Sequence, residues 1–156
     1  SAKNYKATST PMINFDLQKW VYTKNVEENM VYEILSDQEY SSVVQIPFGE
    51  LSNTDEAIYK VSVEVLTNQP IDQNKKPILV TKMIHKKKAY SDKYMEIQPE
   101  ILHTENTWQK VEILNFIPTV RNPKDKFEFF VWKRGNEVLK IRNVQITIYT
   151  KTQPLN

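Results

Sequence analysis

The chain contains Thr107-Trp108-Gln109-Lys110-Val111-Glu112, then Phe127-Glu128-Phe129-Phe130-Val131-Trp132, and then Val138-Leu139-Lys140-Ile141-Arg142-Asn143-Val144-Gln145-Ile146. Successive side chains of a strand point to opposite faces, so Phe127, Phe129 and Val131 share one face. Phe130 and Trp132 carry bulk on the other face. A strand with bulk on both faces lies centrally in its sheet or contributes aromatic side chains to a groove. The order of these stretches is typical of the closing strands of a β-sandwich.

Earlier parts of the chain repeat this strand pattern. Tyr59 to Val65 alternates apolar with polar side chains, which predicts a strand with one solvated face. Val44 to Phe48 also alternates, and Pro47 places that strand at a sheet edge or a bulge because proline cannot donate to the ladder. Turn residues separate the apolar runs: Asn68-Gln69-Pro70, Asp72-Gln73-Asn74, Asn122-Pro123-Lys124-Asp125 and Arg134-Gly135-Asn136. Their spacing predicts an all-β, antiparallel β-sandwich instead of alternating strands and helices.

The apolar positions shift parity near the C-terminus. They pass from Leu139 and Ile141 to Val144 and Ile146. One extra residue in the strand would produce this shift, because it moves all later side chains to the other face. The sequence therefore predicts a bulge at Arg142-Asn143.

The stretch from Val26 to Leu35 fits two kinds of element. Its apolar positions match a helical stripe about as well as a strand, and Asn25 could cap a helix. One short helix near residues 26–35 is therefore an alternative to a further strand.

Composition sets the size and class of the domain. A chain of 156 residues with 40% hydrophobic content fits one β-sandwich domain over residues 1–156, with ragged tails at Ser1–Ser9 and Thr150–Asn156. The chain has no Cys, so it has no disulfide and no thiol chemistry. Its 21 Lys and Arg against 19 Asp and Glu give a formal charge of +2, which disfavours a nucleic-acid partner.

Membrane segments are not indicated either. No apolar run approaches the ~20 residues needed to cross a bilayer, and Ser1-Ala2-Lys3-Asn4-Tyr5 lacks the regions of a signal peptide. We expect no direct membrane insertion by this segment.

The closing strands also carry a family resemblance. Asn106-Thr107-Trp108-Gln109-Lys110-Val111, then Lys126 to Trp132, then Val138 to Ile148, resembles the galactose-binding-like jelly rolls of bacterial surface and secreted proteins, which include carbohydrate-binding modules. The similarity extends more weakly back through Glu39-Tyr40-Ser41-Ser42 and Ala57 to Val65, and covers about two thirds of the chain. It is a similarity of pattern and includes no signature motif.

The resemblance implies an extracytoplasmic module, periplasmic, cell-surface or secreted, that binds a carbohydrate or glycan beside the other domains of its parent protein. Many members hold a structural calcium ion and carry an acidic pair where this chain has Arg142-Asn143, and they are richer in Gly than this chain, which has two. We therefore expect no cofactor, with structural calcium as the alternative.

Sugar binding needs aromatic faces against sugar rings and polar side chains for the hydroxyl groups. Candidates for carbohydrate binding are Trp132 and Arg134 at a strand end, with Tyr90 and Tyr94 beside His85-Lys86-Lys87-Lys88 in an expected loop. A core position is favoured over a binding role for Trp132, and more so for Trp108, because large aromatic side chains are highly buried on average. Trp20 fits either role.

The one concentrated cluster of charge in the sequence is the run Lys86, Lys87 and Lys88. They would suit a polyanion, with Tyr90 and Tyr94 for stacking, or they are simply the solvated tip of a hairpin.

Motifs for catalysis are missing from the sequence. His85 and His103 have no flanking ligand pattern, and two Gly in total exclude most phosphate loops. We therefore predict no catalytic residue and no metal ligand. The alternatives to a carbohydrate-binding module are a structural or protein-interaction sandwich without a sugar site, and a small polysaccharide lyase or hydrolase.

Overall fold

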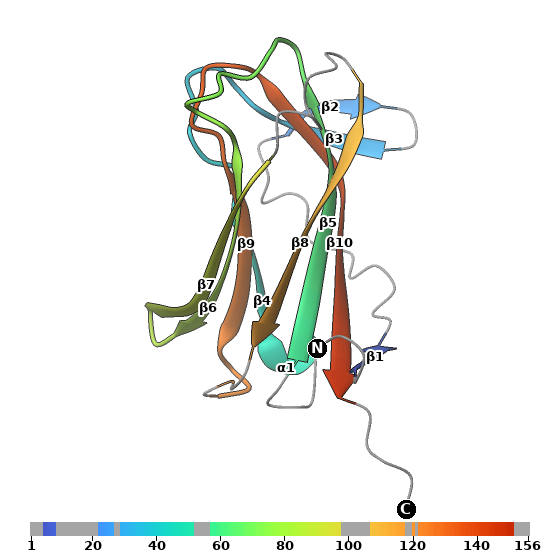
Figure 1. The fold of residues 1–156 in the computed structure, drawn as a ribbon, viewed down its shortest axis with the longest axis vertical. Coiled ribbons are helices and arrows are strands. Elements are labelled where there is room, and N and C mark those ends of the chain that lie inside the picture. Colours follow the sequence, from blue (N-terminus) through green and yellow to red (C-terminus); the bar gives the residue numbers. More distant parts are fainter. Residues whose placement is uncertain are drawn as a thin grey trace, which may run out of the picture.

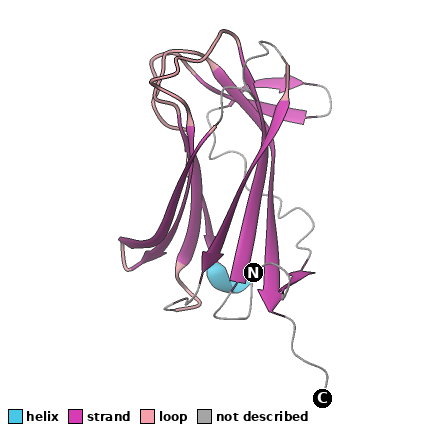
Figure 2. Cartoon of the chain, viewed as in Figure 1, coloured by secondary structure: helices cyan, strands magenta, loops and turns pink. Residues whose placement is uncertain are grey.

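The computed structural model describes residues 5–8, 22–26, 29–51, 57–97, 107–117, 120 and 122–151. These residues form strands and one short helix, which is the only helix of the described part of the chain (Figure 2). The elements are β1 (Tyr5–Thr8), β2 (Tyr22–Val26), β3 (Asn29–Ile34), β4 (Val44–Pro47), α1 (Phe48–Leu51), β5 (Ala57–Thr67), β6 (Ile78–His85), β7 (Lys88–Glu96), β8 (Gln109–Ile117), β9 (Lys126–Trp132) and β10 (Leu139–Lys151).

The strands pair into two antiparallel sheets that face each other (Figure 1). The first, sheet A, has six strands in the order β2-β3-β10-β5-β8, with β1 paired to the far end of β10. The second, sheet B, has four strands in the order β4-β9-β6-β7. The predicted antiparallel β-sandwich is thus confirmed.

The core lies between the two sheets and uses the alternation seen in the sequence. Sheet A contributes Val61, Val63 and Val65, and sheet B contributes Phe127 and Phe129, all of them buried. Burying apolar side chains of this size contributes roughly 1.5–3 kcal/mol each to the free energy of folding. The core residues of β5 and β9 therefore stabilise the domain substantially. α1 lies at the lower end of the view in Figure 1, where Phe48 and Leu51 join the core.

One polar contact crosses the core. The hydroxyl of Tyr59 on β5 and the hydroxyl of Thr81 on β6 are hydrogen bonded, and both side chains are buried. Burial raises the pKa of Tyr59, because the charged form would lose its solvation; the hydrogen bonds to Thr81 and Asn115 only partly oppose this. The bond joins the two sheets at a point where an unpaired hydroxyl would be costly.

Two irregularities predicted from the sequence are present. The register of β10 against β5 shifts between Arg142 and Gln145, and Asn143 has a φ of 53°, which confirms the bulge. β4, which ends at Pro47, is an edge strand of sheet B, in agreement with the position of the proline.

The helix proposed near residues 26–35 is wrong for the described residues. Asn29–Ile34 is strand β3, which pairs with β2 on one side and with β10 on the other. The spacing of apolar residues left helix and strand open for this stretch. Pairing with two neighbouring strands, together with the burial of Tyr32 and Ile34 against the core, favours the strand. Tyr5–Thr8 pairs with Ile148–Lys151.

Candidate functional site

Aromatic side chains gather on the outer face of sheet B. Phe130 and Trp132 alternate with the core residues of β9 and therefore point away from the core. Tyr94 of β7 reaches the same face, because it and Phe130 both pair with Val80 of β6. Tyr40 joins them through an isolated bridge to Trp132. We call Tyr40, Tyr94, Phe130 and Trp132 the aromatic face.

The rings of the aromatic face contact one another. Tyr40 stacks on Trp132 with ring centroids 6.0 Å apart and an interplanar angle of 18°, and it meets Phe130 edge-on at 6.1 Å. Tyr40 and Tyr94 are 50% and 52% exposed, whereas Val80 beneath the face is fully buried. The rings thus cover the sheet and still present apolar surface to solvent.

Cationic side chains lie among these rings. Lys82 Nζ lies 5.5 Å from the centroid of Phe130 and 6.0 Å from that of Tyr94, so it sits between them. The guanidinium of Arg134 lies 5.7 Å from the ring of Trp132. Cations at these distances are attracted by the ring faces.

Arg134 is held in place by its hydrogen bonds. Its Nε donates to the carbonyl oxygen of Lys76 at 2.7 Å, and its Nη2 lies 3.3 Å from Oε1 of Glu96. Lys76 Nζ also pairs with Glu96 at 3.6 Å. The rim of the aromatic face therefore offers a fixed donor and a carboxylate beside Trp132.

The strand end after Trp132 is fixed from within. Lys133 is fully buried, and its Nζ donates to the carbonyl oxygens of Gly135 at 2.6 Å and Ser36 at 3.3 Å. Burial lowers the pKa of Lys133, although the charges of Glu137 and Asp37 oppose this. Lys133 thus anchors the turn that carries Arg134 and faces away from the aromatic face.

Three of the four predicted sugar-binding residues come together. Trp132, Arg134 and Tyr94 lie on the aromatic face or at its rim. Tyr90 does not: it packs against the core, and its hydroxyl donates to Oδ2 of Asp125 at 2.6 Å. The expected loop around Tyr90 and Tyr94 is wrong as well, since both lie in strand β7.

A bulge separates the two tyrosines of β7. Thr81 pairs with Lys93 but Met83 pairs with Tyr90, so β7 carries one extra residue there, and Ser91 has a φ of 50°. Without the bulge, Tyr90 and Tyr94 would share a face. The extra residue turns Tyr90 toward the core.

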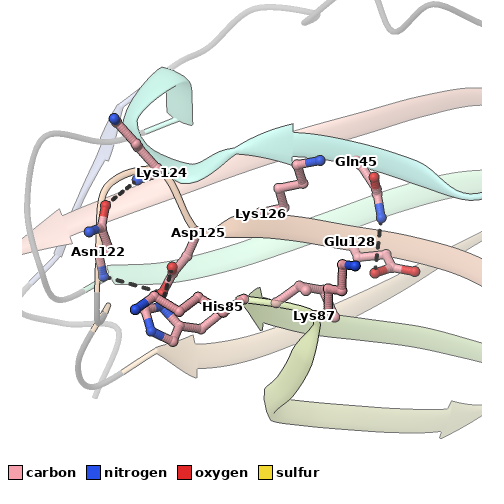
Figure 3. A pocket seen from close by; sticks show the side chains of 10 residues that line it. Gln45, His85, Lys87, Asn122, Lys124, Asp125, Lys126 and Glu128 are labelled. Carbon is pink, nitrogen blue, oxygen red and sulfur yellow. Dashed lines mark hydrogen bonds and ion pairs between the residues drawn. The ribbon is translucent and has the colours of Figure 1, made fainter.

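A second feature is a pocket of about 620 Å³ beside the β6–β7 turn (Figure 3). Lys86 and Lys87 line it together with Lys124 and Lys126, whereas Lys88 does not. The lysine run lies at the tip of the β6–β7 hairpin, and it is joined by Lys124 from the β8–β9 connection and Lys126 from the start of β9. We call this space the basic pocket.

Asp125 organises one wall of the basic pocket. Its Oδ1 lies 2.7 Å from Nδ1 of His85, and its Oδ2 accepts from the Tyr90 hydroxyl and from the backbone N–H of Asn122 at 3.2 Å. Burial acts to raise the pKa of Asp125, but the hydrogen bonds from Tyr90 and His85, the charge of His85 and the Asn122 N–H outweigh it and lower that pKa. Asp125 therefore stays ionised and fixes the His85 ring.

The remaining tryptophans lie elsewhere. Trp108 is half-buried outside the core, and the guanidinium of Arg142 lies 4.0 Å from its ring, so the expected core position is wrong. Trp20 lies outside the described residues.

The described residues contain no group of three or more His, Cys, Asp or Glu side chains able to hold a metal ion. In the same ranges, no helix has the length and apolar character needed to span a bilayer.

Sequence reasoning missed Tyr40 and Lys82 as parts of the aromatic face and Asp125 as the partner of His85. The alternation of Lys82 within β6 could have pointed to the outer face. Nothing local marks Tyr40, whose place depends on a bridge to a distant strand.

No protein-family model matches this chain, and no curated protein matches its sequence. Among solved structures, a family 16 carbohydrate-binding module is similar with a TM-score of 0.49 and 8% identity, over 94% of this chain and 94% of that chain. A Stig cyclase from Fischerella sp. TAU, in complex with (3Z)-3-(1-methyl-2-pyrrolidinylidene)-3H-indole, is similar with a TM-score of 0.40 and 12% identity, over 95% of this chain and 90% of that chain. Similarities this distant concern the fold and carry no information on ligand or activity.

Proposed function

We propose that this domain is a non-catalytic carbohydrate-binding module and that its ligand lies on the aromatic face of sheet B. The observation that carries the proposal is the exposed stack of Tyr40 on Trp132, continued by Phe130, Lys82 and Tyr94. A soluble domain rarely leaves contiguous aromatic surface uncovered unless a ligand or partner uses it.

The chemistry of the aromatic face suits a sugar. Tyr and Trp combine a flat apolar surface with a polar group, and a sugar ring has apolar C–H faces with hydroxyl groups at its edge. Lys82, Arg134 and Glu96 supply donors and an acceptor around the rings. The face therefore offers both the stacking surface and the polar groups that such a ligand requires.

Trp132 adds one unused donor. Its Nε1 is buried and has no hydrogen-bond partner within the described part of the chain. Buried donors are nearly always paired in folded proteins. A ligand hydroxyl could supply the missing partner only after a small movement of the atoms that cover this donor.

The rigid support of the aromatic face also favours binding. Phe130 and Trp132 stand on β9 and Tyr94 on β7, strands whose opposite faces pack against the core, and Tyr40 is held beside them by its bridge to Trp132. A ligand therefore meets a preorganised surface and orders few side chains, which lowers the entropic cost of association. We further infer, as the resemblance implies, that the module serves a larger extracytoplasmic protein.

The protein-interaction alternative rests on a different surface. Leu114 and Phe116 are exposed on β8, an edge strand of sheet A. That edge is partly blocked, because Lys93 Nζ reaches across from β7 and donates to the carbonyl oxygen of Leu114 at 2.8 Å. Two side chains on a blocked edge support docking less well than the aromatic face supports a sugar.

The lyase or hydrolase alternative would use the basic pocket with His85 and Asp125. The pKa of Asp125 is lowered, and its oxygens are occupied by His85, Tyr90 and Asn122. This arrangement suits a carboxylate that positions a ring, not one that donates a proton to a leaving group.

A glycan array tests the proposal. The wild-type domain is compared with a Tyr40→Ala/Tyr94→Ala double variant, and Leu114→Ala serves as a control that removes an exposed apolar side chain from the other sheet. We expect the wild type and the control to bind the same glycans and the double variant to lose them. Binding that persists at raised salt supports stacking, because salt screens exposed charges and not ring contacts. Equal binding by all three proteins, or none by the wild type, would exclude the proposal.

A further inference from the structure

We propose that the glycan is acidic and that the basic pocket takes one of its anionic groups, a sulfate or a carboxylate. This inference rests on the proposed function, since it places one polymer across both the aromatic face and the pocket.

The pocket and the aromatic face lie on the same surface. Lys126 and Glu128 line the pocket and share the outer face of β9 with Phe130 and Trp132, which follow at the same parity. A strand rises about 3.3 Å per residue, so the line from Lys126 to Trp132 is about 20 Å long. A monosaccharide cannot cover both ends of that line, but an oligosaccharide laid along β9 can.

The charge of the pocket favours an anion. Four lysines line it, against the carboxylates of Asp125 and Glu128. Asp125 is committed to His85 and Tyr90, and Glu128 accepts from Gln45 Nε2 at 3.4 Å. Among the described residues, no ion pair involves the ammonium groups of Lys86, Lys87, Lys124 or Lys126. In Figure 3, the side chains of Lys87 and Lys126 extend toward Gln45 and Glu128.

The backbone of the turn gives a second argument. Lys86 and Lys87 have φ values of 47° and 71°, and they are the two central residues between the paired His85 and Lys88. A two-residue hairpin turn with positive φ at both positions strongly prefers Asn-Gly, because other residues are strained there. Lys86 and Lys87 therefore occupy positions where stability alone favours other residues, which supports a role for their charges.

A glycan fits this surface better than other polyanions. A nucleic acid would need many more cations than the nearly balanced chain supplies, since its formal charge is only +2. A flat anionic membrane would not need the aromatic stack that continues from the pocket along β9. Lysine ammonium groups act as point charges, so sulfate and carboxylate are both accommodated.

The turn allows an unusually clean test, with Lys86→Asn/Lys87→Gly as the variant. It removes two charges from the pocket and also relieves the strain of the turn, so we expect it to unfold at a higher temperature than the wild type. Loss of binding by a more stable protein cannot be attributed to misfolding. Lys110→Asn/Lys140→Asn is the matched control, because it removes two charges from sheet A.

Binding is measured on polymer pairs that share a backbone, dextran with dextran sulfate and hydroxyethylcellulose with carboxymethylcellulose, at low and at raised salt. We expect the wild type and the control to prefer the charged member of at least one pair by tenfold or more. The turn variant should lose most of this preference and its salt dependence and keep its affinity for the neutral member. The sulfated and carboxylated arms show which anion is taken.

Each other outcome is informative. The pocket inference is wrong if the turn variant keeps the preference for the charged polymer, or if no charged polymer is preferred. The proposed function still stands in that case if Tyr40→Ala/Tyr94→Ala loses its binding to neutral glycans. If the charged polymers bind but the tyrosine double variant changes nothing, the proposed function is wrong. Equal binding of single-stranded DNA or of phosphatidylserine vesicles would overturn the assignment to a glycan.

Discussion

The ring of Tyr40 stacks on the ring of Trp132, with centroids 6.0 Å apart, on the outside of the sandwich and not in its core. One ring comes from the connection that precedes β4 and the other from the end of β9, so neither segment alone would present this surface. The pair lies at one end of the aromatic face, with Arg134 close to the ring of Trp132, and Lys82 lies further along, close to Phe130 and Tyr94.

Tyr40→Ala should weaken glycan binding about two- to tenfold, since an aromatic pair contributes roughly 0.5–1.5 kcal/mol beyond area burial. Thermal unfolding should change little, because the Tyr40 side chain is half exposed. Tyr40→Phe keeps the ring and should keep most of the affinity. Calorimetric titration with a glycan found on the array measures both variants, and equal affinity of Tyr40→Ala and the wild type would remove Tyr40 from the site.

Trp132→Ala should destabilise the domain by about 1–3 kcal/mol, less than the roughly 3–5 kcal/mol expected for Phe129→Ala in the core. Trp132 is half-buried on the outer face, whereas Phe129 is fully buried between the sheets. Urea unfolding of both variants provides the comparison. A loss for Trp132→Ala as large as that for Phe129→Ala would assign Trp132 a core role.

Tyr59→Phe should cost about 1–3 kcal/mol, because it leaves the buried hydroxyl of Thr81 without its partner across the sandwich. Thr81→Val should be similarly destabilising, and the double variant should recover part of the loss, since both polar groups are then gone. A double-mutant cycle on the free energy of unfolding measures this coupling. Strictly additive losses would show that the bond contributes nothing of its own.

Acid should remove the stability that Asp125 provides. The pKa of Asp125 in the folded protein lies below its ordinary value of 3.8, so the folded state binds the proton more weakly than the unfolded state. The contribution of Asp125 is therefore complete above that ordinary value and is lost as the pH falls through the lowered pKa. Asp125→Asn should lower the unfolding temperature at neutral pH, and the difference from wild type should shrink in acid. Parallel curves for the two proteins down to low pH would contradict this assignment.

The fold was predictable because the alternation of core and outer residues is local. Phe127 to Trp132 shows in the sequence which rings face the core and which face outward, and the structure agrees. The bulge at Asn143 was also visible, since a parity shift in apolar residues is its direct consequence. The bulge at Ser91 was not, because Ser91, Asp92 and Lys93 are all polar and no apolar alternation runs through them. The sequence-based prediction placed Tyr90 and Tyr94 together in a loop, whereas they lie in β7 and the bulge turns Tyr90 toward the core.

The candidate site was only partly predictable, for a related reason. Trp132 and Arg134 lie on or next to β9, whose pattern is readable, whereas Tyr94 was expected in a loop and lies in β7. Tyr40 takes its place through a bridge to a strand far along the chain, and such pairing leaves no local trace. The same holds for Asp125, whose contact with His85 joins the β8–β9 connection to the end of β6.

NMR titration of the indole N–H groups tests most directly where the glycan binds. The chain has three Trp, so the side-chain resonances are few and can be assigned by substitution. Trp132 lies in the aromatic face, whereas Trp108 lies under Arg142 on the other sheet. With increasing glycan, we expect the Trp132 resonance to shift and the Trp108 resonance to stay in place. A shift of Trp108 alone, or a bound glycan that moves neither resonance, would show that the ligand does not lie on the aromatic face.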